Sequence, residues 1–179
     1  MYKIILRGMQ NMKHKLLKTK KLAVVFGTFA PMHIGHVDLI TRAKRENDAA
    51  LVVVSGTNTE EDRGTRVGLH LKRRFRYVRE VFHDDELVVV DKLDEEGMFI
   101  NQNGLENWFE ILHELIKENT DYQFEKITFY IGEEKNQTPL LSYFENVFND
   151  EYLLGKSDTE SSDSIIKKEV GIKIIDKSI

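Results

Sequence analysis

The chain has 179 residues, of which 41% are hydrophobic, so it is long enough for one α/β domain with a full core and short for two. Its formal net charge of −4 argues against strong non-specific binding to DNA, which usually needs a clearly basic domain. Its lack of cysteine excludes disulfides and thiolate-bound metals and fits a reducing compartment, so we expect a cytoplasmic protein.

The first residues contain a short apolar run, Ile4-Ile5-Leu6, which is followed by several lysines. A secretory signal has a longer apolar centre, and no run in the chain approaches the roughly 18 residues of a membrane span. We therefore predict a poorly ordered leader over residues 1–20, a single domain over residues 21–179 and no membrane partner.

Short apolar runs rich in β-branched residues recur along the domain and predict strands buried on both faces. The five runs are Leu22–Phe26, Leu51–Val54, Leu87–Val90, Ile127–Ile131 and Ile172–Ile175. Apolar residues at helical spacing lie in each interval and predict a helix there. They are Val37, Ile40 and Ala43; Leu71, Phe75, Val78 and Phe82; Leu105, Trp108, Leu112 and Leu115; and Leu140, Phe144 and Val147. This alternation predicts a Rossmann-like, doubly wound, five-stranded parallel α/β sheet with helices on both faces.

The segment Asn149–Glu169 differs in composition from the rest of the domain. It is rich in Ser, Asp, Glu and Lys and shows no sustained period apart from the knot Tyr152–Leu154. We therefore expect an exposed excursion that leads into the last strand.

The first predicted strand runs into a turn, Gly27-Thr28-Phe29-Ala30-Pro31-Met32-His33-Ile34-Gly35-His36, and a helix follows near His36. Ligands of open parallel sheets bind beyond the carboxyl ends of the strands, and the free N–H groups of a starting helix suit an anion. Gly27 allows the backbone to approach a ligand closely, and Gly35 allows a tight bend. His33 and His36 lie three residues apart across that bend, so both rings can donate to phosphate oxygens in one pocket.

Two other interpretations of the histidine pair stand beside this one. The rings could be solvated side chains at a helix entry, or they could bind a metal if a further ligand were supplied. Gly27, Phe29 and Pro31 at fixed places after a strand favour the phosphate site, and we predict no metal bound by the protein itself. Nucleotidyl transfer relies mostly on positioning and charge stabilisation, which such a site supplies.

Residues 27–36 resemble the first signature of the nucleotidyltransferase superfamily, Gly-x-Phe-x-Pro-x-His-x-Gly-His. The wider chain is similar to one branch, the NadR-type nicotinamide mononucleotide adenylyltransferases. The similar stretches are Gly27–Arg45, Val53–Gly68, Lys72–Phe82, Lys92–Glu95 and Phe129–Glu133. The resemblance implies adenylyl transfer from ATP, with Mg²⁺, to nicotinamide mononucleotide, which gives NAD and pyrophosphate. ATP and a pyridine mononucleotide are thus the expected partners.

The resemblance also implies roles for individual residues. His33 and His36 would bind the ATP phosphates, and His36 would stabilise charge on the α-phosphate. The backbone around Thr28 and Phe29 would lie near the acceptor nucleotide. Gly132 and Glu133, at the end of the fourth strand, would hold the adenosine side.

Further candidates follow the second and third strands. Arg63 lies in a loop above a strand end, where ligand-binding residues gather, and joins the nucleotide-binding set. Asp94 would order a loop over the acceptor or be an ordinary loop carboxylate. Trp108 would stack on the nicotinamide ring or belong to the apolar core stripe. The basic cluster over residues 72–79 would reach phosphates or form a solvated helix face.

The chain departs from the family pattern in two places. Leu105 stands where the branch tends to carry the first of two tryptophans. The second superfamily signature, Ile-Ser-x-Thr-x-x-Arg, would follow the fifth strand, but Ile179 is the last residue. We therefore expect a domain truncated at its C-terminal end, either a fragment of an enzyme or an inactive, nucleotide-binding or regulatory member.

Other acceptors and partners stay open as alternatives. A cytidylyltransferase-like enzyme would use another acceptor, whereas the phosphopantetheine enzyme usually carries Thr in place of His33 and Asp in place of Ala30. The leader is too short for the helix-turn-helix of some NadR-type proteins, so we expect no DNA partner. The sequence leaves the oligomeric state open, a homo-oligomer included.

Overall fold

A parallel five-stranded sheet forms the centre of the computed structural model, which describes residues 15–59, 62–98, 103–132, 136–157 and 166–175. The strands are β1 (Lys21–Gly27), β2 (Ala49–Gly56), β3 (Val88–Asp94), β4 (Lys126–Ile131) and β5 (Glu169–Ile174). Every adjacent pair is parallel, in the order β3-β2-β1-β4-β5. The predicted Rossmann-like α/β fold is thereby confirmed, and each apolar run overlaps its strand, although Leu87 precedes β3 and Ile175 follows β5.

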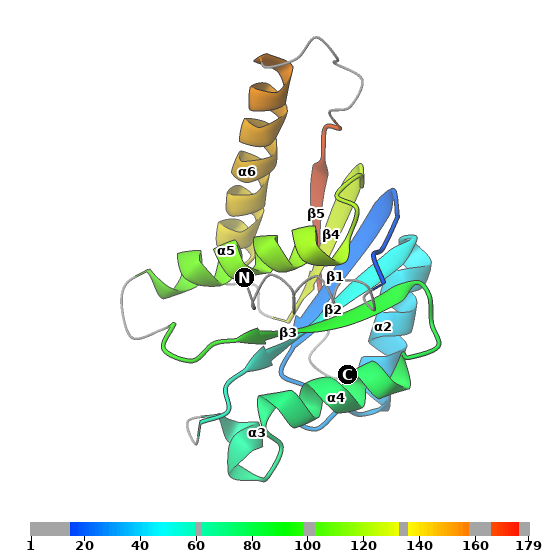
Figure 1. The fold of residues 1–179 in the computed structure, drawn as a ribbon, viewed down its shortest axis with the longest axis vertical. Helices are drawn as coiled ribbons and strands as arrows, with labels where there is room; N and C mark the ends of the chain where they lie inside the picture. The colour runs from blue at the N-terminus through cyan, green and yellow to red at the C-terminus, as the bar shows by residue number, and fades with distance from the viewer. Residues whose placement is uncertain (1–14, 60–61, 99–102, 133–135, 158–165, 176–179) are drawn as a thin grey trace, which may run out of the picture.

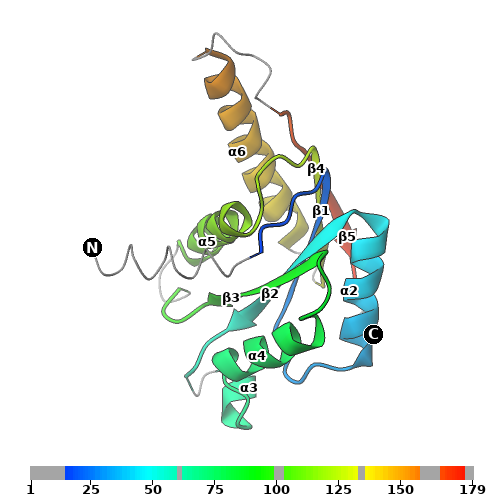
Figure 2. The ribbon, with the colours of Figure 1, turned by 45° about the vertical axis from the view of Figure 1, so that its right-hand side comes forward.

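Helices cover both faces of the sheet (Figures 1 and 2). They are α2 (Ile34–Glu46), α3 (Arg63–Arg66), α4 (Leu71–Val81), α5 (Gly104–Asn119) and α6 (Gln137–Ser157). Successive strand residues point to opposite faces, so the core divides into two layers. Val24 and Val53 pack in the layer with α5 and α6, whereas Val25 and Val52 pack in the layer with α2 and α4. None of the helices described in the structure is both long and apolar enough to cross a membrane.

The strand order places a topological switch point between β1 and β4. The chain moves outward from β1 through β2 to β3 and then returns to pair β4 with the other side of β1. In such sheets a crevice opens outside the carboxyl ends of the two strands where the order reverses, and ligands bind there. The histidine turn follows β1 and Gly132 follows β4, so the predicted phosphate site and the start of the segment predicted to hold the adenosine side both lie at this end.

The two helical layers carry opposite charge. The exposed side chains of α4 include a basic set, Lys72, Arg73, Arg76 and Arg79. The exposed side chains of α5 include four glutamates at a spacing of four residues, Glu106, Glu110, Glu114 and Glu118. Residues four apart share one face of a helix, so the glutamates form an acidic ridge on the layer opposite α4.

The predicted excursion over Asn149–Glu169 is helical in its first part, since α6 continues through Ser157, although none of the side chains from residue 149 to residue 156 is buried, as its composition predicts. Two contacts, and the buried residue just before the segment, hold this part in the helix. Glu151 accepts a hydrogen bond from the Tyr122 hydroxyl, Phe148 is buried one turn before Tyr152, and Lys156 lies over the Tyr152 ring at 4.7 Å. Residues 158–165 lie outside the described residues.

The predicted leader over residues 1–20 is wrong for residues 15–20, which pack on the domain. The Leu17 side chain is only 2% exposed and belongs to the core layer of α5 and α6. Its backbone pairs with the segment that follows α5, because Leu17 donates to the Asn119 carbonyl and accepts from the Asp121 amide. An apolar residue with a core position and two backbone partners fixes this stretch. Residues 1–14 lie outside the described residues.

Candidate active site

The turn after β1 is held in an unusual backbone shape. Phe29 has a φ of 49°, in the left-handed region that residues with a side chain seldom adopt, and the Ala30–Pro31 peptide bond is cis. The Phe29 ring is buried and its centroid lies 4.8 Å from that of His36. The buried ring therefore ties the strained residue to the first turn of α2.

His33 and His36 form a reciprocal cap at the start of α2. The Nδ1 atom of His33 accepts a hydrogen bond from the Gly35 amide at 3.1 Å, and Nδ1 of His36 accepts one from the His33 amide, also at 3.1 Å. The two rings stack with centroids 3.9 Å apart and planes 28° apart. The helix begins at Ile34, two residues earlier than predicted, because His33 takes the N-cap role usually filled by Ser, Thr, Asp or Asn.

This cap determines which ring nitrogens can donate. A neutral imidazole has one N–H and one acceptor nitrogen, and in both rings Nδ1 is the acceptor. The proton of each neutral ring therefore lies on Nε2, which leaves two Nε2–H donors. Burial, and then the nearby His33, lower the pKa of His36 and favour its neutral form. The pair is thus suited to donate hydrogen bonds to an anion while it caps the helix.

A hollow of about 420 Å³ borders His33 between the start of α2 and α4. Its lining is mostly apolar and includes Phe29, Pro31, Met32, Val37, Leu69 and Tyr77. Apolar walls do not bind phosphate groups, and among the lining residues only His33 and the buried Arg74 are ionisable apart from the Tyr77 hydroxyl. Its chemistry suits an apolar group placed beside the histidine pair.

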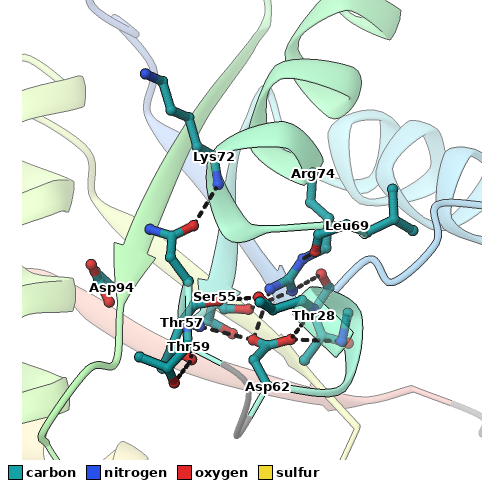
Figure 3. Close-up of polar contacts among 12 residues, drawn as sticks. Thr28, Ser55, Thr57, Thr59, Asp62, Leu69, Lys72, Arg74 and Asp94 are labelled. Atoms are coloured by element: carbon teal, nitrogen blue, oxygen red, sulfur yellow. Dashed lines mark hydrogen bonds and ion pairs between the residues drawn. The ribbon is translucent and has the colours of Figure 1, made fainter. Parts of the chain in front are cut away.

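A buried arginine lies beneath the turn (Figure 3). Arg74 is 1% exposed, and its guanidinium donates from Nη1 to the Thr28 carbonyl at 2.7 Å and from Nε to the Leu69 carbonyl at 2.9 Å. Its Nη1 also reaches the Ser55 carbonyl at 3.3 Å, and its Nη2 donates to Asp62 at 2.7 Å. One side chain therefore connects the chain segments that follow β1 and β2.

Asp62 completes this cluster and caps α3. Its Oδ1 accepts the Gly64 amide at 2.7 Å, and its Oδ2 accepts the Thr57 amide at 2.8 Å as well as Arg74. Burial by itself would raise the pKa of Asp62, but the Thr57 amide and the Arg74 guanidinium outweigh it and hold that pKa below its usual value. Asp62 is therefore a charged, fully engaged carboxylate.

The acceptor-side candidates are the last residue of β3, Asp94, and Trp108 of α5. Asp94 is exposed, whereas Trp108 is only 7% exposed and packs edge-on against Phe26 with centroids 5.1 Å apart. The Trp108 indole N–H donates to Glu95 at 3.0 Å, and burial raises the pKa of Glu95. Trp108 thus takes the core position that its helical stripe predicts, with its polar edge turned toward a half-buried carboxyl group.

The structure brings some of the predicted site residues together. Thr28, Phe29, Gly35 and the two histidines form one continuous turn, with Gly27 as the last residue of β1. Gly132 directly follows β4, the neighbour of β1 at the switch point, whereas Asp94 and Trp108 lie with β3 and α5. Arg63 is the first residue of α3, but its side chain lies outside the described residues, as does Glu133.

Sequence reasoning missed the part played by Arg74, which it grouped with its basic neighbours. The signal was its position: Arg74 follows Leu71 by three residues and precedes Val78 by four, so it lies on the buried stripe of α4. A charged residue on an apolar stripe indicates a buried partner, and here that partner is Asp62.

Comparison with known proteins adds a family to this geometry. The sequence model of the family described as Cytidylyltransferase-like matches residues 24–167. The trifunctional NAD biosynthesis/regulator protein NadR of Salmonella typhimurium is 30% identical over 97 residues, which are 51% of this chain and 23% of that protein. A phosphopantetheine adenylyltransferase of Kocuria rhizophila is 38% identical over 72 residues, which are 40% of this chain and 43% of that enzyme. The chain spans less than half the length of these curated relatives.

Solved structures share the fold. A NadR protein in complex with NR superposes with a TM-score of 0.70 and 33% identity, over 92% of this chain and 39% of that one. A NadR protein in complex with NAD and AMP-PNP superposes with a TM-score of 0.65 and 34% identity, over 89% of this chain and 39% of that one. In these structures too the match covers much less than half of the other chain.

Proposed function

Because this chain belongs to the cytidylyltransferase-like family, we propose that it transfers a nucleotidyl group from a nucleoside triphosphate to a phosphorylated acceptor. The predicted resemblance to nucleotidyltransferases, the NadR type included, is confirmed by the family match and by the NadR relatives and structures. The specific reaction that we propose is adenylyl transfer from ATP to nicotinamide mononucleotide. An oxygen of the acceptor phosphate attacks the α-phosphorus of ATP in line, and pyrophosphate leaves with NAD as the other product.

The observation that carries this proposal is the histidine pair at the switch point. Both imidazoles accept a backbone hydrogen bond through Nδ1 at the start of α2, after the carboxyl end of β1, which leaves the Nε2–H group of each ring to donate. Nucleotidyl transfer builds negative charge on the oxygens around the α-phosphorus, and preorganised donors stabilise that charge. In the proposed mechanism His36 donates to an α-phosphate oxygen and His33 donates to the departing pyrophosphate.

The backbone of the turn would hold the acceptor. The Thr28–Phe29 segment lies directly after β1, where ligands of such sheets approach the strand ends. Arg63 and Gly132 would contact the nucleotide from the neighbouring strand ends, and Glu133 would bind the adenosine side. Asp94 and Trp108 would contact the acceptor base. For Trp108 this requires the largely buried ring to be exposed to the base, beside the hydrogen bond that its indole N–H donates to Glu95.

Mg²⁺ enters this proposal as part of the nucleotide substrate. Over the described ranges, from residue 15 to residue 175 with their gaps, no three His, Asp or Glu side chains are grouped so that they could hold a metal ion. Mg²⁺ keeps several waters and prefers substrate phosphate oxygens as its remaining ligands. The ion would therefore arrive on ATP and neutralise the pyrophosphate as it leaves.

The test is a transferase assay with ATP, Mg²⁺ and nicotinamide mononucleotide, in which NAD is measured by a coupled dehydrogenase. Parallel reactions replace the acceptor by 4′-phosphopantetheine and ATP by CTP, which covers the two alternative activities. We expect NAD from the first mixture only. If no NAD forms but another mixture gives a product, the substrates are reassigned. If none of these nucleotides raises the unfolding temperature in a thermal-shift panel, the proposal is overturned.

A variant pair tests the site itself. His36→Ala should lower kcat by about 10²–10³-fold, the loss typical of one preorganised donor to a developing charge. His83→Ala is the matched control, because the His83 side chain is 79% exposed and its ring contacts only Asp84 among the ion pairs of the described residues. Equal turnover in both variants would show that the histidine pair is not the catalytic site.

A further inference from the structure

The buried Arg74 calls for an explanation beyond stability. Taking a charge out of water costs several kcal/mol, and buried ion pairs are often no more stabilising than well-packed apolar residues. Here the cost is met by four polar partners, three of them main-chain carbonyls. A rigid guanidinium fork with fixed donor directions is the side chain best suited to hold carbonyls at set positions. The arrangement indicates that Arg74 fixes backbone geometry.

The carbonyl that matters most belongs to Thr28. In a trans peptide the C=O and the following N–H point in opposite directions. The Thr28 carbonyl points at Arg74, at 2.7 Å from Nη1, so the Phe29 amide N–H points away from Arg74. Phe29 is the residue of the turn with a left-handed φ, which a rotation of this peptide would change. Holding the carbonyl therefore aims one backbone donor of the turn.

The same cluster fixes the second wall of the site. Asp62 bonds Arg74 and three amides, so it holds the segment after β2 against the start of α3, whose first residue is Arg63. The adjacent Gly56 carbonyl accepts the Glu95 amide at 2.8 Å, which extends the connection to the end of β3. The ion pair thus joins the segments that follow β1 and β2, and strand pairing joins β2 to the end of β3.

We propose that Arg74 and Asp62, here named the Arg74–Asp62 clamp, are positioning residues that orient the Thr28–Phe29 peptide for the phosphate of the acceptor. This inference rests on the proposed function. Arg74 is 1% exposed and Asp62 is engaged by four donors, so neither side chain contacts the substrate itself. The clamp acts through the direction of the Phe29 N–H, and its effect falls on acceptor binding more than on ATP.

The experiment compares Arg74→Lys and Asp62→Asn with Arg76→Lys, an exposed position on the same helix. Lysine keeps the charge of Arg74 but cannot hold three carbonyls with a planar fork. We expect KM for the acceptor to rise about tenfold in both clamp variants, with kcat and KM for ATP within about threefold of wild type. The control should match wild type in all three constants.

Two further measurements separate positioning from folding. Thermal unfolding sets an assay temperature well below the midpoint of every variant, and Arg74→Ala is assayed with and without added guanidinium ion. Recovery of the acceptor KM on adding guanidinium supports the clamp, since a general loss of stability would not be repaired in one constant. A lower midpoint with unchanged KM values, or failure of both clamp variants to fold, would overturn it.

A binding measurement distinguishes failure of the clamp from failure of the proposed reaction. Binding of nicotinamide mononucleotide is also measured by calorimetry, which needs no turnover. If wild type binds the mononucleotide without forming NAD, the proposed reaction fails, and a roughly tenfold weaker Kd in Arg74→Lys still supports the clamp. An equal Kd in Arg74→Lys and wild type overturns the clamp whether or not NAD forms, and so does a wild type that does not bind the mononucleotide.

Discussion

His33 and His36 hold each other in place at the start of α2, each through the Nδ1 atom of its ring, with ring centroids 3.9 Å apart. Neither ring needs to rotate or change tautomer to present Nε2–H to an anion. The site is therefore preorganised before a nucleotide binds, which is the condition under which fixed donors contribute most to catalysis.

The first prediction concerns pH. The pKa of His36 lies below 6.5 in the folded protein, because of burial and then of His33, so below pH 6.5 the unfolded chain binds more protons. The stability that this ring contributes is complete above pH 6.5 and is lost as the pH falls through the lowered pKa. His36→Gln keeps an acceptor at the third helical position without titrating there. In urea unfolding at several pH values, wild type should lose more stability below pH 6.5 than His36→Gln, and parallel curves would contradict the cap.

A second prediction separates capping from catalysis at His33. His33→Ala removes the cap and should lower the free energy of unfolding by about 1 kcal/mol, whereas His33→Asn keeps a good capping side chain and should lose only a fraction of that. Both variants lack the Nε2–H donor, so both should lose transferase activity by about 10²-fold. Urea unfolding and NAD formation measure the two effects. Activity restored in His33→Asn would mean that only the cap matters.

A third prediction tests the close packing around the clamp. A Cβ built on Gly56 would meet both Asp62 and Arg74, at 2.6 Å from Nη2 of the latter, and Gly56 has a φ of 152°. Gly56→Ala should therefore destabilise the protein by roughly 3 kcal/mol and raise KM for the acceptor. Gly97→Ala is the control, because its φ is 76° with no atom within 4 Å of the built Cβ. Thermal unfolding should place Gly97→Ala clearly above Gly56→Ala.

A fourth prediction tests the buried polar cluster that anchors α6. The Tyr122 hydroxyl donates to Glu151 at 2.7 Å and lies 2.8 Å from Nε2 of His113. Tyr122→Phe leaves the carboxylate and the imidazole without this partner and should lower the free energy of unfolding by about 1–3 kcal/mol. Tyr77→Phe, at a side chain that is 47% exposed, should change it by less than about 0.5 kcal/mol. If Tyr122→Phe and Tyr77→Phe lower the free energy of unfolding equally in urea, the hydrogen bond between Tyr122 and Glu151 does not anchor α6.

The fifth prediction concerns the stretch before β1. Leu17 is 2% exposed and its neighbour Leu16 is 48% exposed. Leu17→Ala should lower the free energy of unfolding by about 2–5 kcal/mol, since it empties a core position, and Leu16→Ala by less than about 1 kcal/mol. Denaturant titration of the two variants measures both. If Leu17→Ala lowers the free energy of unfolding by less than about 1 kcal/mol, residues 15–20 are only loosely attached to the domain.

The sequence was sufficient for the sheet because its central strands β2, β1 and β4 are largely buried on both faces, whereas the edge strand β5, predicted to be buried in the same way, is half-buried to exposed. The run Leu51–Val54 is apolar at every position, and Ile127–Ile131 is interrupted only by Thr128; turn residues separate both runs from the helices. The histidine turn could also be found, since Gly27, Pro31 and Gly35 have recognisable backbone roles. The reciprocal cap could not, because His is an uncommon N-cap residue and its acceptor nitrogen depends on the local geometry.

The parts that sequence reasoning missed depend on contacts between distant segments. Leu17 pairs with the residues after α5, and Glu151 is joined to Tyr122, so neither position is explained by its neighbours in the chain. For Trp108 the sequence predicts the position but not the hydrogen-bond partner. Its stripe predicted a core position, but only the structure gives Glu95 as the partner of its indole N–H.

The opposite charges of α4 and the α5 ridge give the molecule a lopsided electric field, although its net charge is only −4. The sheet and its two core layers keep these charges apart, so their effects do not cancel near the surface. The α4 face attracts an anion such as a nucleotide, and the α5 ridge repels it. The resulting field orients the two molecules relative to each other before they make contact. Added salt weakens such steering, because the screening length falls to about 10 Å at 0.1 M ionic strength. Since one face is basic and the opposite face acidic, the protein should be retained on both anion and cation exchangers.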